Sequence, residues 1–155
     1  MTAAQNRNDD GSDDETTTLL TFTLAGNRYA VAVDAVASVL GVTNERPLEG
    51  TSDPWNAGAV AVAGERVRVV DLARILTSAL RTTARVDEPQ LLVFADADED
   101  ATHYGWLVDD VDAARTVRTS ALEPPRTATP TRFVKGRLEV AGEEAIWLDE
   151  RAING

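Results

Sequence analysis

The sequence offers little of the chemistry that catalysis requires. Its 155 residues include a single histidine, His103, and no cysteine. The G-x-S-x-G nucleophile elbow, a phosphate-binding glycine loop and the H-E-x-x-H zinc motif are all missing from the sequence. Without cysteine the chain forms no disulfide, no thiolate metal site and no cysteine nucleophile. We therefore interpret His103 as a surface or partly packed side chain, and we expect no enzyme, no metal site and no cofactor.

Two groups of acidic residues have spacings that invite comparison with metal sites. Asp96, Asp98, Glu99 and Asp100 lie close together, but the central glycine of a calcium loop is missing and the twelfth position is Leu107. A solvated hairpin loop explains this run better, because turns favour aspartate. Four further aspartates each follow an expected strand: Asp34, Asp71, Asp109 and Asp149. We interpret these four as capping residues rather than as a carboxylate cluster.

The charge of the chain restricts its partners. Asp and Glu number 26 against 15 Lys and Arg, for a net charge of −11, and Lys135 is the only lysine. This charge opposes binding to nucleic acid and to anionic membrane surfaces. No apolar run reaches the roughly 18 residues of a membrane span, and the N-terminus is acidic where a signal peptide is basic. We expect a cytoplasmic protein with no nucleic-acid partner and no direct membrane insertion, and the composition is typical of a salt-adapted, halophilic proteome.

The elements that would position any site are mainly strands. Residues 1–18 are polar and acidic and are predicted to form a disordered tail, followed by one folded domain over 19–155. Apolar side chains recur at every second position from Leu20, which predicts a half-buried strand with a hairpin turn at Gly26-Asn27. Apolar residues at positions 33, 36 and 40 fall near helical spacing and predict a short helical turn after Asp34.

A second hairpin and an amphipathic helix are predicted next. Strands over 59–63 and 67–70 are joined through Gly64-Glu65, where glycine can adopt the positive φ of a type II′ turn. Behind Asp71, apolar residues recur at the spacing of one helix face, which predicts a short amphipathic helix. The residues of this face are Leu72, Ile75, Leu76, Ala79 and Leu80.

The chain contains two copies of one pattern. Tyr29, Val33, Asp34 and Val36 recur as Tyr104, Val108, Asp109 and Val111. Further on, Gly58, Val62-Ala63-Gly64-Glu65, Asp71 and Ile75 recur as Gly136, Val140-Ala141-Gly142-Glu143, Asp149 and Ile153. A constant order of hairpin, loop, hairpin and cap implies two copies of one all-β unit, each too short to bury its own faces. We predict subdomains over about 19–86, plus closing segments, and about 87–155, packed together.

The three tryptophans are large apolar anchors with different surroundings. Trp106 and Trp147 lie in expected strands and are predicted to be in the core. Trp55 lies in a loop between Pro54 and Asn56, and both a packed position and an interface position remain open for it.

The two halves together resemble the CheW-like domain from about residue 19 to residue 153. The segments that carry the resemblance are Phe22-Thr23-Leu24 through Tyr29 and Val33-Asp34, residues 58–72 (GAVAVAGERVRVVDL), residues 105–111 (GWLVDDV) and residues 120–124 (SALEP). The second is similar to the family's G-V-x-N-L-R-G followed by an apolar strand and V-D-L, and the third to its G-x-x-V-D-x-V.

This resemblance implies an all-β fold with short helices, built from two five-stranded SH3-like barrels. It also implies a non-enzymatic adaptor that binds the cytoplasmic tip of a chemoreceptor and the regulatory domain of the histidine kinase CheA. In the family, the groove between the barrels and nearby residues of the first subdomain meet the receptor helices. Candidate partner-binding positions carried over from the family are Val36, Ser38, Leu40, Ala61, Ala63 and Gly64.

The sequence departs from the family at three of these positions. Ala61 and Ala63 take the places of the usual asparagine and arginine, and Ser38 stands where some members carry glutamate. Arg66 or Arg68, on the outward face of the next strand, is placed to compensate for the lost arginine. Besides ordinary coupling, these departures leave open a paralogue that binds one partner only, as an array filler or competitor. A small-ligand-binding β-barrel is the remote alternative.

Overall fold

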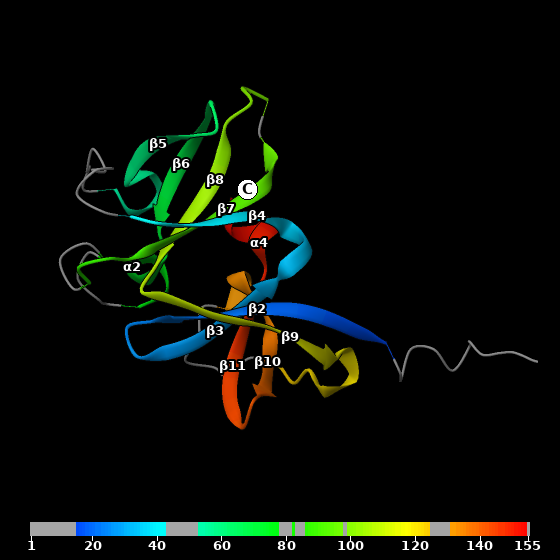
Figure 1. Cartoon of the computed structure of the whole chain (residues 1–155). Helices are drawn as coiled ribbons and strands as arrows, with labels where there is room; N and C mark the ends of the chain where they lie inside the picture. The colour runs from blue at the N-terminus through cyan, green and yellow to red at the C-terminus, as the bar shows by residue number, and fades with distance from the viewer. Residues whose placement is uncertain are drawn as a thin grey trace, which may run out of the picture.

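A computed structural model describes residues 15–42, 53–77, 82, 86–97, 99–124 and 131–154. Within these residues the chain forms two five-stranded sheets joined by short helical segments (Figure 1). We call them the terminal sheet and the central sheet, after the parts of the chain that supply their strands. The predicted all-β fold of two repeated five-stranded units is confirmed.

The terminal sheet is built from both ends of the chain. Its strands are β2 (Thr16–Leu24), β3 (Asn27–Ala32), β9 (Asp110–Arg118), β10 (Val134–Val140) and β11 (Glu143–Leu148). They lie in the order β10-β11-β3-β2-β9, and β11 runs parallel to β3 while the other neighbours are antiparallel.

The central sheet is built from the middle of the chain. Its strands are β4 (Val36–Gly41), β5 (Gly58–Val62), β6 (Glu65–Asp71), β7 (Gln90–Ala97) and β8 (His103–Val108). They lie in the order β4-β7-β8-β6-β5, and β6 runs parallel to β8 while the other neighbours are antiparallel.

The two sheets are copies of one arrangement in which the repeats have exchanged hairpins. Hairpin β5–β6 corresponds to β10–β11, β7–β8 corresponds to β2–β3, and β4 corresponds to β9, so that the two strand orders match. Hairpin β2–β3 from the first repeat completes the terminal sheet, and β7–β8 from the second completes the central sheet. The expected boundary near residue 86 is therefore not a boundary between the two sheets, because each sheet takes strands from both halves.

The hairpin turns have alanine and glycine at their centres. Ala63 has a φ of 51° and Gly64 a φ of 82°, and the equivalent turns at Ala25-Gly26 and Ala141-Gly142 are alike. Positive φ at both central residues defines the type I′ turn, whose twist matches that of the flanking strands. The predictions of a type II′ turn at Gly64-Glu65 and a turn at Gly26-Asn27 are wrong by one residue. Glu65 and Asn27 instead begin β6 and β3.

The helical segments are short. They are η1 (Val33–Ala35), η2 (Pro54–Asn56), α2 (Leu72–Leu76), η3 (Thr119–Ala121), η4 (Thr131–Phe133) and α4 (Glu150–Asn154). The turn predicted after Asp34 is limited to η1, and the helical interpretation of Val36 and Leu40 is wrong because both lie on β4. The predicted helix after Asp71 is present as α2, whereas Ala79 and Leu80 lie outside the described residues. None of the described helices is long and apolar enough to cross a membrane.

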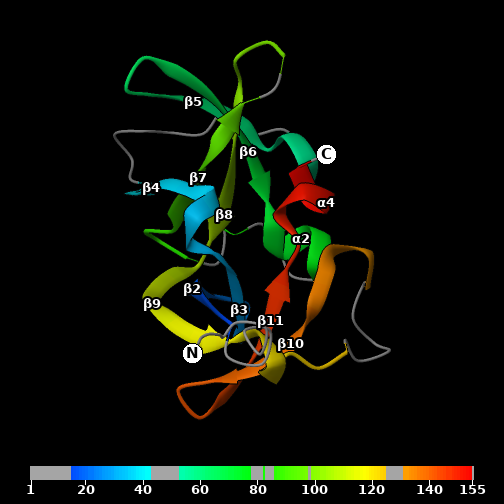
Figure 2. The ribbon, with the colours of Figure 1, turned by 90° about the vertical axis from the view of Figure 1, so that its right-hand side faces the viewer.

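The main core lies between the two sheets. Phe22 of β2 lies 6.3 Å from Trp106 of β8, and Phe94 of β7 lies 4.4 Å from Trp106, measured between ring centroids. Trp106 is fully buried and Trp147 is 7% exposed, which confirms the core prediction for both. Figure 2 shows the central sheet above the terminal sheet, with α2 and α4 beside their junction.

Candidate functional site

The predicted partner-binding positions lie at opposite edges of the central sheet. Val36, Ser38 and Leu40 lie on β4, whereas Ala61 lies on β5 and Ala63-Gly64 form the turn that follows. Strands β7, β8 and β6 lie between β4 and β5 in the sheet order. Strand pairing therefore does not bring the two groups of positions together.

On β4 the predicted residues point toward the protein rather than away from it. Val36, Ser38 and Leu40 are half-buried, and Val36 packs against the main core. The residues between them are exposed, and Val39 is 38% exposed. Helical spacing of residues 33, 36 and 40 did not single out Val39, which lies at the exposed edge of the sheet on β4.

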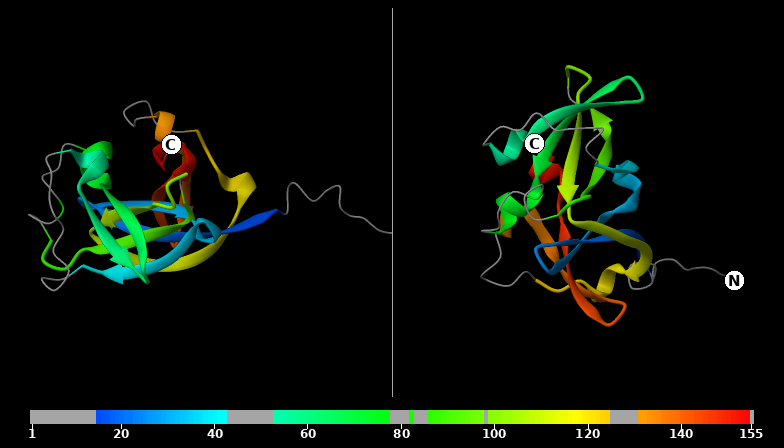
Figure 3. Two further views of the ribbon diagram at one scale, coloured as in Figure 1. Left: turned by 90° about the horizontal axis from the view of Figure 1, so that it is seen from above. Right: turned by 60° about the vertical axis from the view of Figure 1, so that its left-hand side comes forward.

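On β5 the exposed positions lie beside two arginines. Ala59 pairs with Arg68 and Ala61 pairs with Arg66, and directly paired residues share one face of a sheet. The Arg68 guanidinium carbon lies 5.6 Å from the centroid of the Tyr104 ring on β8. We call these five residues the arginine face. Figure 3 (right) shows the green β5–β6 hairpin projecting from the end of the molecule distant from the terminal sheet.

The single histidine lies on the opposite face of the central sheet, at the start of β8. His103 Nε2 lies 2.8 Å from the Glu65 carboxylate, and its Nδ1 lies 2.9 Å from the carbonyl oxygen of Phe94. His103 is half-buried, as the interpretation of a partly packed side chain expected. Because strand residues alternate between faces, Glu65 and Arg66 point to opposite sides of the sheet.

A groove of about 450 Å³ lies between the central sheet and α4. Its lining residues are Ala35, Phe94, Asp96, Ala97, Tyr104, Glu150, Arg151 and Asn154. Since α4 follows β11 of the terminal sheet, the groove lies at the junction of the two sheets. Tyr104 belongs both to this groove and to the arginine face, so the two surfaces are continuous.

Hydrogen bonds cap the start of α4 and fix its end to β8 of the central sheet. The Asp149 carboxylate accepts from the backbone N–H groups of Arg151 and Ala152 at 3.1 and 3.3 Å, which confirms its capping role. The buried Trp106 indole donates its N–H to Asn154 Oδ1 at 2.8 Å. One wall of the groove is therefore fixed to the main core.

The capping interpretation is wrong for the other aspartates. Asp71 is 3% exposed and accepts from the backbone N–H and hydroxyl of Thr82 at 3.1 and 2.8 Å, instead of capping α2. Asp109 accepts from the backbone N–H of Ala25 at 3.0 Å, and Asp34 lies inside η1. The described residues contain no cluster of three His, Cys, Asp or Glu side chains that could hold a metal ion. Of the predicted hairpin-loop run, Asp98 lies outside the described residues.

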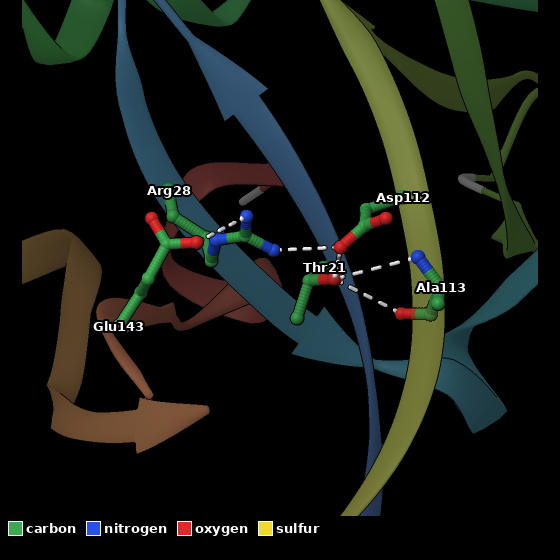
Figure 4. Close-up of polar contacts among 5 residues, drawn as sticks. All are labelled: Thr21, Arg28, Asp112, Ala113 and Glu143. Atoms are coloured by element: carbon green, nitrogen blue, oxygen red, sulfur yellow. Dashed lines mark hydrogen bonds and ion pairs between the residues drawn. The ribbon is translucent and has the colours of Figure 1, made fainter. Parts of the chain in front are cut away.

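A polar network stiffens the outer side of the terminal sheet (Figure 4). Arg28 donates to Asp112 at 2.6 Å and to Glu143 at 2.9 Å, and so connects β3 with β9 and β11. At the β-bulge between β2 and β9, the buried Thr21 hydroxyl donates to the Ala113 carbonyl at 3.0 Å and accepts from its N–H. The hydrogen bond from Arg28 lowers the pKa of Asp112, and the same bond raises the pKa of Arg28.

Among the described residues, Trp55 is the other exposed large apolar residue besides Val39. It is 37% exposed, and the centroid of its ring lies 5.5 Å from that of Phe133, the last residue of η4 before β10. This contact joins η2, beside the central sheet, to η4 of the terminal half. The position of Trp55 is thus partly packed and partly open to a partner.

Comparison with known proteins identifies the family. The family model of the CheW-like domain matches residues 18–154. The chain belongs to the CheW-like family. The fold of this CheW-like chain is similar to that of the scaffolding protein TtCheW from Thermoanaerobacter tengcongensis, with a TM-score of 0.71 and 18% sequence identity over 87% of this chain and 85% of that chain. None of the proteins with curated functions matches the sequence.

Proposed function

We propose that this CheW-like chain is a non-enzymatic chemotaxis adaptor in the cytoplasm. It would couple the cytoplasmic tip of a chemoreceptor to the regulatory domain of the histidine kinase CheA. The observation that carries this proposal is the match of the CheW-like domain model to residues 18–154. The two-sheet fold shared with the TtCheW scaffold supports it.

The surfaces of the central sheet suit a protein that acts by binding. The groove at the junction of the sheets combines aromatic residues, Phe94 and Tyr104, with polar residues of α4. Such a mixture suits an amphipathic helix, which places apolar anchors in a groove and polar residues at its rim. We assign the receptor helix to this groove and to the neighbouring β5–β6 hairpin, which includes Ala61, Ala63 and Gly64.

The β4 edge provides a second surface that a partner in the groove need not cover. β4 is the last strand in the order of the central sheet, so one side of its backbone has no strand neighbour in the sheet. An exposed edge of this kind accepts another strand or packs against a partner. The exposed Val39 adds an apolar contact there, beside Val36, Ser38 and Leu40.

The experiment that tests this function is a reconstitution with three purified components. The chain, CheA and the cytoplasmic fragment of a receptor from the same organism are mixed at the salt concentration of its cytoplasm. Size-exclusion chromatography with light scattering then measures which complexes form. We expect one complex that contains all three proteins, and receptor-dependent activation of CheA only when the chain is present.

The other outcomes separate the alternatives. Capture of the receptor or of CheA alone would identify a one-partner paralogue, which the alanines at positions 61 and 63 make a specific possibility. Binding of neither protein would refute an adaptor role.

A further inference from the structure

We propose that the arginine face binds a partner helix that presents two carboxylates one helical turn apart. The face consists of Ala59, Ala61, Arg66, Arg68 and Tyr104. The inference deepens the proposed function and rests on it for the identity of the partner, which would be the receptor tip. The chemistry of the contact follows from the face itself.

The spacing of the arginines fits such a helix. Arg66 and Arg68 are two residues apart on β6 and share one face, so their Cα atoms are separated by about 7 Å. On a helix, residues four apart lie on one face and are about 6 Å apart along the axis. Two glutamates or aspartates at this helical spacing can therefore each meet one guanidinium, with the planar fork geometry that arginine forms with carboxylates.

Within the part of the chain that the structure describes, these two arginines form no ion pair with a carboxylate. Among the described residues, Arg28 pairs with two carboxylates, and Arg137 lies 3.1 Å from Glu123 and 3.6 Å from Glu144. Neither Arg66 nor Arg68 forms an ion pair with another described residue. In a chain with a net charge of −11, two arginines on one face with no described carboxylate partner form a local positive surface.

The nearest acidic neighbour in the sequence is directed away from this surface. Glu65 precedes Arg66 but lies on the other face of β6, where its carboxylate is 2.8 Å from His103 Nε2. Strand alternation and this contact together keep the Glu65 charge from neutralising Arg66.

The shape of the face permits close approach. Ala59 and Ala61 are exposed and carry only methyl groups, and β5 is the last strand of the central sheet. No longer side chain of β5 therefore separates an incoming helix from the two guanidinium groups. Tyr104 continues the surface into the groove beside α4, so that one helix can contact both.

Screening by salt limits how far acidic residues elsewhere on the chain weaken this attraction. At an ionic strength of about 0.15 M, charges more than about 8 Å away are largely screened. A carboxylate in contact with Arg66 or Arg68 responds mainly to these arginines. Higher salt weakens the contact as well, since both guanidinium groups are at least partly exposed.

The test uses two helical peptides of identical composition as probes of the full-length chain. Each is an alanine-rich peptide of about 20 residues, long enough to form a helix, with glutamines and two glutamates. In one peptide the glutamates are four positions apart, and in the other two positions apart, which places them on nearly opposite sides of the helix. Binding is followed by amide chemical shifts of the ¹⁵N-labelled chain at low and at 0.5 M salt.

We expect shifts at β5, β6 and Tyr104, and affinity at least about tenfold higher for the four-residue spacing. The double variant Arg66→Gln/Arg68→Gln should lose about 10- to 100-fold in affinity for that peptide. Arg118→Gln is the matched control, because Arg118 is exposed on β9 of the other sheet and its loss should change the affinity less than twofold. Equal binding of both peptides, unchanged binding by the double variant, or shifts confined to another surface would overturn the proposal.

A second double variant keeps the test informative if the glutamine variant does not fold. Arg66→Lys/Arg68→Lys keeps both charges but removes the planar fork, so it should bind the matched peptide more weakly than the wild type and more tightly than the glutamine variant. Failure of the wild type to join receptor and kinase would refute the proposed function while leaving peptide binding intact. A three-protein complex that forms equally well with Arg66→Gln/Arg68→Gln would refute this inference alone.

Discussion

Gly105 of β8 allows two buried side chains to pack directly against its backbone. A Cβ atom added at this position would lie 2.7 Å from Cγ1 of Val67 and 3.0 Å from Cδ1 of Leu91. Both side chains are 1% exposed, and valine has little freedom at χ1. Neither can turn away without displacing its neighbours in the central sheet. We predict that Gly105→Ala destabilises the protein through overpacking.

The size of the effect follows from two opposing contributions. Extra methyl groups in a well-packed core cost about 1–3 kcal/mol, whereas replacing glycine by alanine in a strand recovers up to about 1 kcal/mol of backbone entropy. The net loss in the free energy of unfolding should be about 1–2 kcal/mol. In a chain of this length, that loss corresponds to a decrease in Tm of about 2–8 °C.

The measurement is urea unfolding followed by tryptophan fluorescence, with Gly41→Ala as the matched control. Gly41 is exposed at the end of β4, and a Cβ atom added there meets no atom within 4 Å. This control should be neutral or slightly stabilising. If Gly105→Ala unfolds at the same urea concentration as Gly41→Ala, the argument from close packing is wrong.

A double-mutant cycle with Val67 tests the cause. Val67→Ala removes the methyl group that a new Cβ at position 105 would strike, so the second substitution should cost less in that background. Contacting residues have coupling energies of about 0.5–3 kcal/mol. We expect a coupling energy in this range, with the double variant more stable than the sum of the two single effects predicts. Additive effects of the two substitutions would show that the destabilisation does not come from the contact with Val67.

The remaining predictions concern a surface network, a buried carboxylate and cooperativity. Because Arg28 lowers the pKa of Asp112 below its ordinary 3.8, their pairing stabilises the fold above that pH, and the contribution is lost as pH falls through the lower pKa of the folded state. The difference in urea midpoint between the wild type and Asp112→Asn should therefore be constant from pH 5 to 7 and shrink below about pH 4. Thr82→Val removes the hydroxyl that donates to the buried Asp71 carboxylate and should cost about 1.5–3 kcal/mol in urea unfolding, whereas Thr82→Ser should cost less. Far-ultraviolet circular dichroism and tryptophan fluorescence should report one coincident unfolding transition, and two separate transitions would show that the sheets unfold independently.

Much of the fold could be predicted from alternation and repetition. The period of two in residues 20–24 is the period of β2, and the repeat offsets match equivalent strands of the two sheets. The exchange of hairpins could not be predicted in the same way. The sequence offset between the two repeats is the same whether a hairpin joins the sheet of its own repeat or the sheet of the other repeat. Only the pairing between strands distinguishes these two arrangements.

The errors in the turns and in β4 have local causes. Ala63 adopts a positive φ that is uncommon for residues other than glycine, so the sequence alone favoured glycine as the first turn residue. Residues 33, 36 and 40 match helical spacing by coincidence, since three positions cannot separate a helix from an η1 turn followed by a strand. The arginine face could be recognised only from the register of β5 with β6 and of β6 with β8. The residue pattern within a single strand does not contain this information.

The exchanged hairpins join the two sheets into one body. Each sheet contains two strands supplied by the other repeat, so neither sheet can separate from the other without losing β2–β3 or β7–β8. Trp106 reinforces the junction, because its ring packs between the sheets and its N–H bonds to α4. The groove, the arginine face and the β4 edge therefore lie on one packed body. Under the proposed adaptor function, we expect a partner bound at one of these surfaces to act on the others through packed strands rather than through a flexible linker.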